Sequence, residues 1–255
     1  MQRIAAVDLD DTLLRSDGTL SPRTLHAMQR WQESGRQIVI ATGRPPRTIG
    51  RSLPEYLHQI PWICYNGAEI RQANEAIYQN LVPAADVYAI LTQVQQVMPD
   101  LLVGVEIDNV LYLNRVAKRS TPYEVADLLS LDRPAAKVLL FSETMEPLAR
   151  LTFDLPVSAR ALYSARYPHF IQILGCRTDK VEALRSLVAQ WQMTLADVVA
   201  FGDDTNDVEM VAQSGKGVAV AKAVDEVKAV ADCVTLSNDE DGVASVLEEL
   251  LGVEE

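Results

Sequence analysis

The sequence predicts an α/β protein with a doubly wound parallel sheet and a second, α+β domain inserted into it. Short β-branched apolar runs, each ending in polar residues, occur near both ends of the 255-residue chain. Continuous rather than alternating apolar runs are typical of strands buried on both faces, as in a parallel sheet. Helical patterns separate these runs, and strand–helix–strand alternation indicates a doubly wound core. The middle of the chain instead shows paired strands.

Six apolar runs predict the strands of the parallel sheet. The first begins at Ile4 and leads into Asp8, and the second leads into Thr42. The fourth leads into Gly202 and two aspartates. The six runs cover 4–7, 37–41, 61–65, 198–201, 217–221 and 233–236.

Four helices are expected between these strands. Ser21 and Pro22 suit the start of the first, as N-cap and first helical residue, and Gly35 suits its end. The other three are expected over 179–191, after 205, and over 223–231.

Residues 83–177 are predicted to form the inserted α+β domain, and residues 1–82 with 178–255 the α/β core. The inserted pattern is close to αββ given twice. Its expected elements are a helix over 84–98, strands over 101–107 and 110–113, a helix over 123–129, a strand over 136–141, a helix over 143–153, and strands over 157–163 and 170–174.

Composition excludes several classes of protein. The net charge of −12 disfavours a nucleic-acid partner, which would require a basic face. The apolar runs are too short to span a membrane, and Asp8 comes too early for a signal peptide. Three widely spaced cysteines form no CxxC pair. We therefore expect a cytoplasmic protein, a monomer or small homo-oligomer, with no membrane partner.

Polar groups follow the predicted strands where the strands end. Ligands bind beyond the carboxyl ends of the strands in open parallel sheets. Each residue alone is more simply a cap, a turn former or a solvated side chain, but their convergence on one edge indicates a site. Carboxylates crowded together raise each other's pKa, and Mg²⁺ would relieve that repulsion. The residues concerned are Asp8, Asp10, Thr42, Lys180, Asp203, Asp204 and Asp207.

These residues resemble four motifs of the haloacid dehalogenase (HAD) superfamily. Asp8-Leu9-Asp10-Asp11-Thr12 resembles its DxDxT signature, and Thr42-Gly43-Arg44 its second motif. Lys180 resembles the third, and the run from Gly202 to Asp207 the GDxxND fourth. The resemblance covers essentially the whole chain. The insertion between motifs two and three is similar to the C2-type cap of the Cof-like, subfamily IIB sugar phosphatases. Asn66-Gly67-Ala68 also resembles that group.

The resemblance implies a Rossmann-like HAD core and a role for each matching residue. Asp8 would be the nucleophile that forms an aspartyl phosphate, and Asp10 the general acid and base. As i and i+2 on an extended strand, both would point to one face. The phosphate would be bound by Thr42, Gly43, Arg44, Lys180 and Asn206, and Mg²⁺ by Asp8, Asp10 (through its backbone carbonyl), Asp203 and Asp207. Asp11, Val181 and Lys222 depart from the common pattern but leave this set intact.

The function expected from this resemblance is a Mg²⁺-dependent phosphatase of small phosphorylated metabolites, sugar phosphates above all. A phosphomutase and a sucrose-phosphate-type phosphatase stay open on the same fold. A receiver-like signalling module and a non-catalytic relative are weaker alternatives. A dinucleotide-binding enzyme is disfavoured because no GxGxxG follows the first strand. Arg115, Lys118, Arg119 and Tyr123 form a polar stretch that is more simply a solvated loop than a substrate contact.

Overall fold

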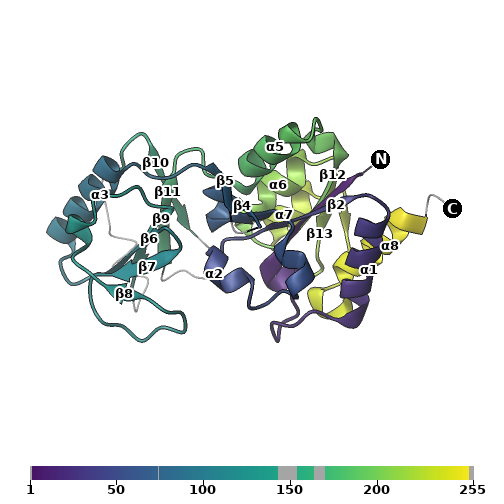
Figure 1. The fold of residues 1–255 in the computed structure, drawn as a ribbon, viewed down its shortest axis with the longest axis horizontal. Helices are drawn as coiled ribbons and strands as arrows, with labels where there is room; N and C mark the ends of the chain where they lie inside the picture. The colour runs from purple at the N-terminus through teal and green to yellow at the C-terminus, as the bar shows by residue number, and fades with distance from the viewer. Residues whose placement is uncertain (1, 74, 143–153, 164–169, 253–255) are drawn as a thin grey trace. The chain divides into compact units, whose positions relative to one another are not determined.

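The computed structural model describes residues 2–73, 75–142, 154–163 and 170–252. The chain separates into two compact units, Met1–Tyr78 with Asp179–Glu255, and Gln79–Thr178 (Figure 1). The chain therefore leaves the first unit after Tyr78 and re-enters it at Asp179. Within the described ranges, no helix is both long enough and apolar enough to cross a membrane.

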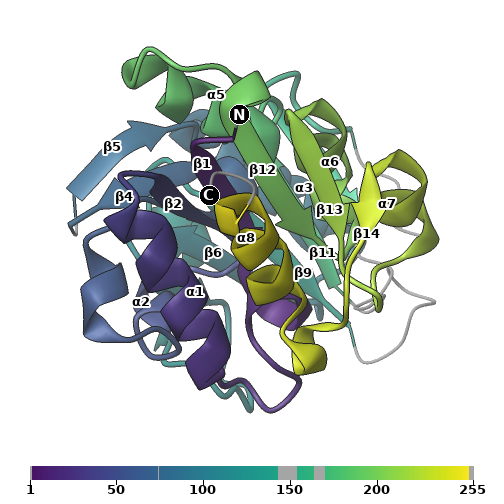
Figure 2. The same cartoon turned by 90° about the vertical axis from the view of Figure 1, so that its right-hand side faces the viewer.

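The first unit contains an eight-stranded sheet in the order β14-β13-β12-β1-β2-β3-β4-β5 (Figure 2). The strands from β14 to β3 are parallel, and β4 runs antiparallel to β3. All six predicted strands are confirmed, whereas β4 and β5 extend the sheet beyond the prediction. The bounds are β1 Ile4–Asp8, β2 Gln37–Ala41, β3 Trp62–Cys64, β4 Glu69–Gln72, β5 Glu75–Gln79, β12 Val198–Gly202, β13 Lys216–Ala219 and β14 Cys233–Val234.

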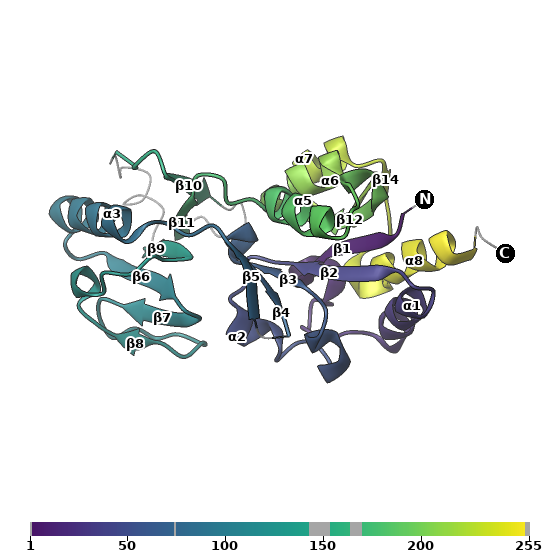
Figure 3. The ribbon, with the colours of Figure 1, turned by 45° about the horizontal axis from the view of Figure 1, so that its top comes forward.

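Helices cover both faces of this sheet (Figures 2 and 3). On one face lie α1 (Pro22–Glu33) and α8 (Gly242–Gly252); on the other lie α5 (Lys180–Gln190), α6 (Val208–Gln213) and α7 (Asp225–Val230). The predicted caps of α1 are confirmed, since Ser21 Oγ accepts from the N–H of Thr24 at 2.9 Å and Gly35 has a φ of +80°. Helix α8 was not among the predicted helices. A short helix, α2 (Pro46–Ile49), follows β2.

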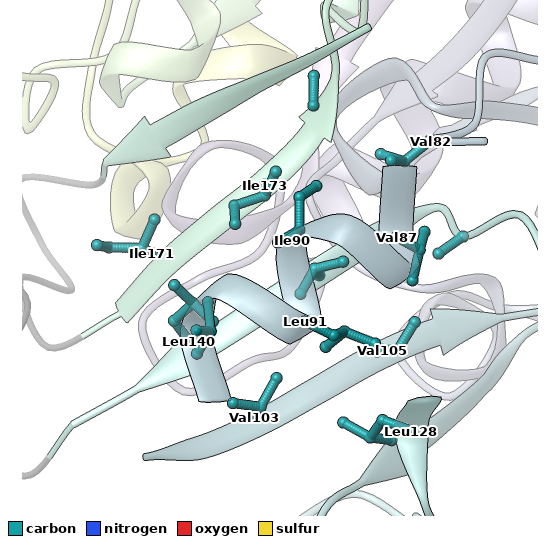
Figure 4. Packing of buried hydrophobic residues seen from close by; sticks show 14 of the residues in the cluster. Val82, Val87, Ile90, Leu91, Val103, Val105, Leu128, Leu140, Ile171 and Ile173 are labelled. Atoms are coloured by element: carbon teal, nitrogen blue, oxygen red, sulfur yellow. The ribbon is translucent and has the colours of Figure 1, made fainter. Parts of the chain in front are cut away.

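The second unit contains a six-stranded sheet in the order β10-β11-β9-β6-β7-β8. Helix α3 (Ala84–Val97) packs on one face of it, with Ile90 and Leu91 against Val105 and Leu140 (Figure 4). All pairings in this sheet are antiparallel except that of β7 with β8. The bounds are β6 Leu102–Ile107, β7 Val110–Leu113, β8 Glu124–Val125, β9 Lys137–Phe141, β10 Ala159–Tyr163 and β11 Phe170–Gly175.

The helix predicted over 123–129 is wrong. Glu124 and Val125 form a short strand beside β7, and Leu128–Ser130 forms a 3-10 turn. Asp127 caps this turn, since its Oδ1 accepts from the N–H of Leu129 at 3.1 Å. The strand pairing and the cap satisfy the backbone locally, so no helix is needed there. The helix predicted over 143–153 lies outside the described residues.

Candidate active site

A buried lysine joins two carboxylates at the carboxyl edge of the parallel sheet. Asp8 is the last residue of β1, and Lys180 is the first residue of α5. The Nζ of Lys180 donates to Asp8 Oδ1 at 2.5 Å and to Asp207 Oδ1 at 2.6 Å. Asp179 caps the helix, since its Oδ1 accepts from the N–H of Val181 at 3.1 Å. The cap fixes the residue at which α5 begins and thereby positions Lys180.

Asp203 completes a group of three buried carboxylates. One oxygen each from Asp8, Asp203 and Asp207 lies within 4.8 Å of the others. Burial raises the pKa of Asp8 well above its usual range, and the charges of Asp207 and Asp203 raise it further, while Lys180 lowers it. For Lys180, burial lowers the pKa, but Asp207 and Asp8 outweigh that effect and raise it overall. One lysine thus faces three acids.

This donor set fits a divalent metal ion. Carboxylate oxygens are the ligands that Mg²⁺ and Ca²⁺ prefer, and Mg²⁺ is held by few carboxylates together with water and substrate oxygens. Three ionised carboxylates beside one ammonium group would leave net negative charge, which a bound dication would neutralise. The residues present therefore suit a metal centre.

The turn after β12 places Asp203 and Asp207. Only glycine fits at position 202, because a Cβ there would lie 2.4 Å from the Cβ of Asp207. Asp207 Oδ2 accepts from the N–H groups of Asp203 and Asp204, at 3.1 and 3.2 Å. Thr12 Oγ1 donates to Asp203 Oδ1 at 2.8 Å. Asp204 accepts from the N–H of Thr205 at 2.8 Å and serves as the cap of this turn, not as a member of the carboxylate group.

The side chain of Asp10 does not belong to the group of three carboxylates. Strand β1 ends at Asp8, and residues Leu9–Leu13 form a π-helical turn in which Asp11 has a φ of +57°. The expectation that Asp8 and Asp10 share one face of an extended strand is therefore wrong. The side chain of Asp10 is 51% exposed, and both of its oxygens accept from Arg44, Oδ2 from Nε at 2.8 Å. Arg44 Nη1 also donates to Ser52 Oγ at 2.8 Å.

The remaining predicted phosphate-binding residues meet around Asn66. Thr42 is buried, and its Oγ1 accepts from the N–H of Arg44 at 3.1 Å. Asn206 Nδ2 donates to Asn66 Oδ1 at 2.9 Å. The same oxygen lies 2.9 Å from where a Cβ on Gly43 would be.

Two residues of the site received no role from the sequence. Thr12 belongs to the quoted DxDxT pattern, yet the pattern alone does not reveal its bond to Asp203. Asn66 follows the third predicted strand, so its place at the polar edge of the sheet was the signal that could have found it.

The fold and this site together define an α/β enzyme with a carboxylate-rich centre. The model of the haloacid dehalogenase-like hydrolases matches residues 5–247, and the chain belongs to this family. It is similar to 5-amino-6-(5-phospho-D-ribitylamino)uracil phosphatase of Bacillus subtilis, with 28% identity over 262 residues that cover 96% of each protein.

Solved structures agree with the family. A haloacid dehalogenase-like hydrolase from Bacteroides thetaiotaomicron superposes with a TM-score of 0.85 at 27% identity, over 98% of this chain and 100% of that one. A HAD subclass IIB sugar phosphatase superposes with a TM-score of 0.83 over 98% of this chain and 99% of the other. At 22% identity, this likeness supports the fold of the chain and not its activity. The predicted HAD fold and family are confirmed.

Proposed function

We propose that this protein is a Mg²⁺-dependent phosphatase of small phosphorylated metabolites, acting through an aspartyl phosphate on Asp8. The observation that carries the proposal is the buried contact of Asp8 with Lys180 inside a group of three carboxylates. An ionised carboxylate in such a place is a ready nucleophile, and the lysine offers positive charge to a phosphoryl group. The similarity to a curated phosphatase supports the same chemistry.

Mg²⁺ would be held by Asp8, Asp203 and Asp207, together with the backbone carbonyl of Asp10. When bound, it would neutralise charge on the phosphoryl oxygens and orient them. Asp207 would bind it directly or through water. Lys180 and the bound metal would together favour the ionised form of Asp8, and Lys180 would also contact the phosphate.

The reaction would run in two displacements at phosphorus. One oxygen of Asp8 forms a bond to phosphorus as the ester P–O bond breaks, and Asp10 gives its proton to the departing alkoxide. Asp10 then takes a proton from water, whose oxygen attacks the aspartyl phosphate. Inorganic phosphate leaves, and the Asp8 carboxylate is restored. Thr42, Gly43 and Asn206 would hold the phosphoryl oxygens throughout.

Arg44 has a further part in this scheme. Its guanidinium binds Asp10 and Ser52 in the structure. We infer that it exchanges Asp10 for phosphate oxygens when substrate enters, because a guanidinium fits phosphate and carboxylate with the same two-pronged geometry. Released from the guanidinium, Asp10 can then take up a proton from solvent, which it gives to the departing alkoxide.

The second unit, predicted over 83–177, would be the cap domain that selects the substrate. We expect a sugar phosphate or a similar polyol phosphate, since the curated relative is named for a phosphorylated ribityl compound. The net charge of −12 repels phosphate dianions, so the approach of substrate gains no electrostatic steering. We place the protein in the cytoplasm on its cysteine usage, as a monomer or small homo-oligomer.

The test is phosphate release from a panel of sugar phosphates and p-nitrophenyl phosphate, with Mg²⁺ and with EDTA. We expect metal-dependent turnover that falls at least about a thousandfold in Asp8→Asn, because the nucleophile is lost. Asp100→Asn makes the same change at an exposed position of the other unit and should retain full activity. Turnover that survives Asp8→Asn would contradict the aspartyl-phosphate route.

Binding of beryllium fluoride separates the alternatives if no ester is hydrolysed. Beryllium fluoride that binds only with Mg²⁺ would favour a phosphomutase or a phosphatase whose substrate is not in the panel. A protein that neither hydrolyses esters nor binds this phosphate mimic would be a non-catalytic relative.

A further inference from the structure

A three-residue turn after β3 touches three separate segments of the candidate site. The turn consists of Tyr65, Asn66 and Gly67, whose φ angles are +53°, +59° and +100°. All three residues are buried. Left-handed backbone is unfavourable for Tyr, whereas Asn and Gly adopt it more readily, so Tyr65 above all needs support from tertiary contacts.

The first contact is with the loop that carries Thr42, Gly43 and Arg44. The N–H of Asn66 donates to the carbonyl of Thr42 at 3.0 Å, and the N–H of Tyr65 donates to the carbonyl of Arg44 at 3.1 Å. The side-chain oxygen of Asn66 occupies the space beside Gly43, where any Cβ would lie only 2.9 Å from it. The turn thus holds the proposed phosphate-binding loop in two ways: by backbone hydrogen bonds and by the packing of the Asn66 side chain beside Gly43.

The second contact is with the segment that carries Asn206 and Asp207. The same Asn66 oxygen accepts from Asn206 Nδ2 at 2.9 Å, and Asn206 directly precedes the aspartate bound by Lys180. One oxygen atom therefore lies between the phosphate-binding loop and the edge of the carboxylate group.

The third contact is with the start of helix α5. A Cβ on Gly67 would lie 2.2 Å from the carbonyl oxygen of Asp179, the N-cap residue that precedes Lys180. Only a residue without a Cβ allows this approach. The turn therefore packs directly against the start of α5 and so helps to position Lys180.

We propose that Asn66 is a positioning residue for phosphoryl transfer, acting through the hydrogen bond that its side-chain oxygen accepts from Asn206. The inference rests on the proposed phosphatase function, and no reacting atom touches Asn66 in this scheme. If Asn66 only supported the fold, its replacement would lower stability, and any change in kcat would be the same whether or not Asn206 is present.

The test is a double-mutant cycle between Asn66→Gly and Asn206→Ala. Glycine tolerates the left-handed backbone, so Asn66→Gly removes the side-chain oxygen without adding strain. We expect kcat on p-nitrophenyl phosphate to fall about tenfold, as for the loss of one hydrogen bond to a positioned group, with KM changed less than kcat. In the Asn206→Ala background the same change should cost less than about twofold, because the partner is already absent.

One further variant serves as a control. Asn109 also has a left-handed φ, of +65°, but lies between β6 and β7 in the other unit. Asn109→Gly is therefore the same substitution on the same kind of backbone, and kcat should be unchanged.

The outcomes separate this inference from the proposed function. If the wild-type protein releases phosphate but Asn66→Gly lowers kcat equally with and without Asn206→Ala, the inference is overturned and the proposed function is not. If no ester is hydrolysed, the cycle is measured on the dissociation constant for orthovanadate with Mg²⁺, where the same coupling supports the inference and its absence overturns it. A wild-type protein that neither hydrolyses esters nor binds orthovanadate overturns both.

Discussion

Among single residues, Lys180 offsets the most negative charge in the carboxylate group, because it contacts two of its members. It is buried, and it donates to both Asp8 and Asp207. Removing one partner of a buried ion pair leaves an uncompensated charge, which is more costly than the pair itself is stabilising. The lysine is thus needed for folding as well as for the proposed chemistry.

The raised pKa of Asp8 predicts a pH-dependent response to metal. Above the usual Asp pKa of about 4 and below its raised value in the fold, Asp8 keeps a proton that the unfolded chain has released. The folded metal-free protein therefore loses stability as pH rises through that window. A divalent cation relieves the resulting charge, so Mg²⁺ should raise Tm more at pH 8 than at pH 5.

Thermal unfolding with Mg²⁺ and with EDTA, from pH 4.5 to 8, measures this response. Asp8→Asn has no acid to titrate at this position, so it should show a smaller pH slope in EDTA than the wild type. A Mg²⁺ effect on Tm that does not change with pH would contradict the prediction.

The sequence predicts the convergence of Asp8, Lys180, Asp203 and Asp207 because strand ends mark one edge of a parallel sheet. It does not predict the surroundings of Asp10, because the strand ends two residues earlier and a π-helical turn intervenes. Nor does it reveal the contacts of Asn66, which depend on left-handed backbone angles and on partners far along the chain.

Among the elements, the fully buried strands were the most readily predicted, and the largely exposed strand β5 was missed. All five residues of β1 and of β12 are buried, which produces the continuous apolar runs seen in the sequence. Four of the five residues in β5 are exposed, so no such run marks it. The wrongly predicted helix over 123–129 shows a related limit, because strand pairing and a side-chain cap decided its structure rather than periodicity.

The close approach of Gly67 to α5 predicts different costs for two Gly→Ala changes. Gly67 and Gly35 both have positive φ angles, but a Cβ on Gly35 would meet nothing within 4 Å. Gly35→Ala should lower the free energy of unfolding by about 1 kcal/mol, from backbone strain alone. Gly67→Ala adds the clash with Asp179, so we expect a larger loss of stability and a lower kcat through displacement of Lys180.

Urea unfolding and steady-state kinetics on both variants measure these effects. Gly35→Ala is the matched control, with normal kcat expected. Equal stability and equal kcat in the two variants would show that the approach of Gly67 to the helix is not required.

At the scale of the whole molecule, each unit has its own hydrophobic core. Ile90 belongs to the cluster of the second unit, whereas Leu187 belongs to a cluster of the first. The three tryptophans, Trp31, Trp62 and Trp191, all lie in the first unit. Tryptophan fluorescence therefore reports on one unit, and far-ultraviolet circular dichroism on both.

Ile90→Ala should destabilise the second unit by about 2 to 5 kcal/mol, the usual cost of such a cavity. We expect the circular dichroism transition in urea to broaden or split toward lower concentration, while the fluorescence midpoint stays within error. Leu187→Ala should move the fluorescence midpoint instead. A fluorescence midpoint that shifts equally in both variants would mean that the two units unfold as one cooperative body.

The double crossing of the chain between the units has a mechanical consequence. Arg3 and Gly252 both belong to the first unit, and the second is spliced in between Tyr78 and Asp179. A pulling force applied between Arg3 and Gly252 is thus carried by the parallel sheet, with β1 at its centre. The spliced-in unit bears no tension until that sheet has ruptured, so the segment expected to choose the substrate is mechanically shielded by the segment expected to carry out the chemistry.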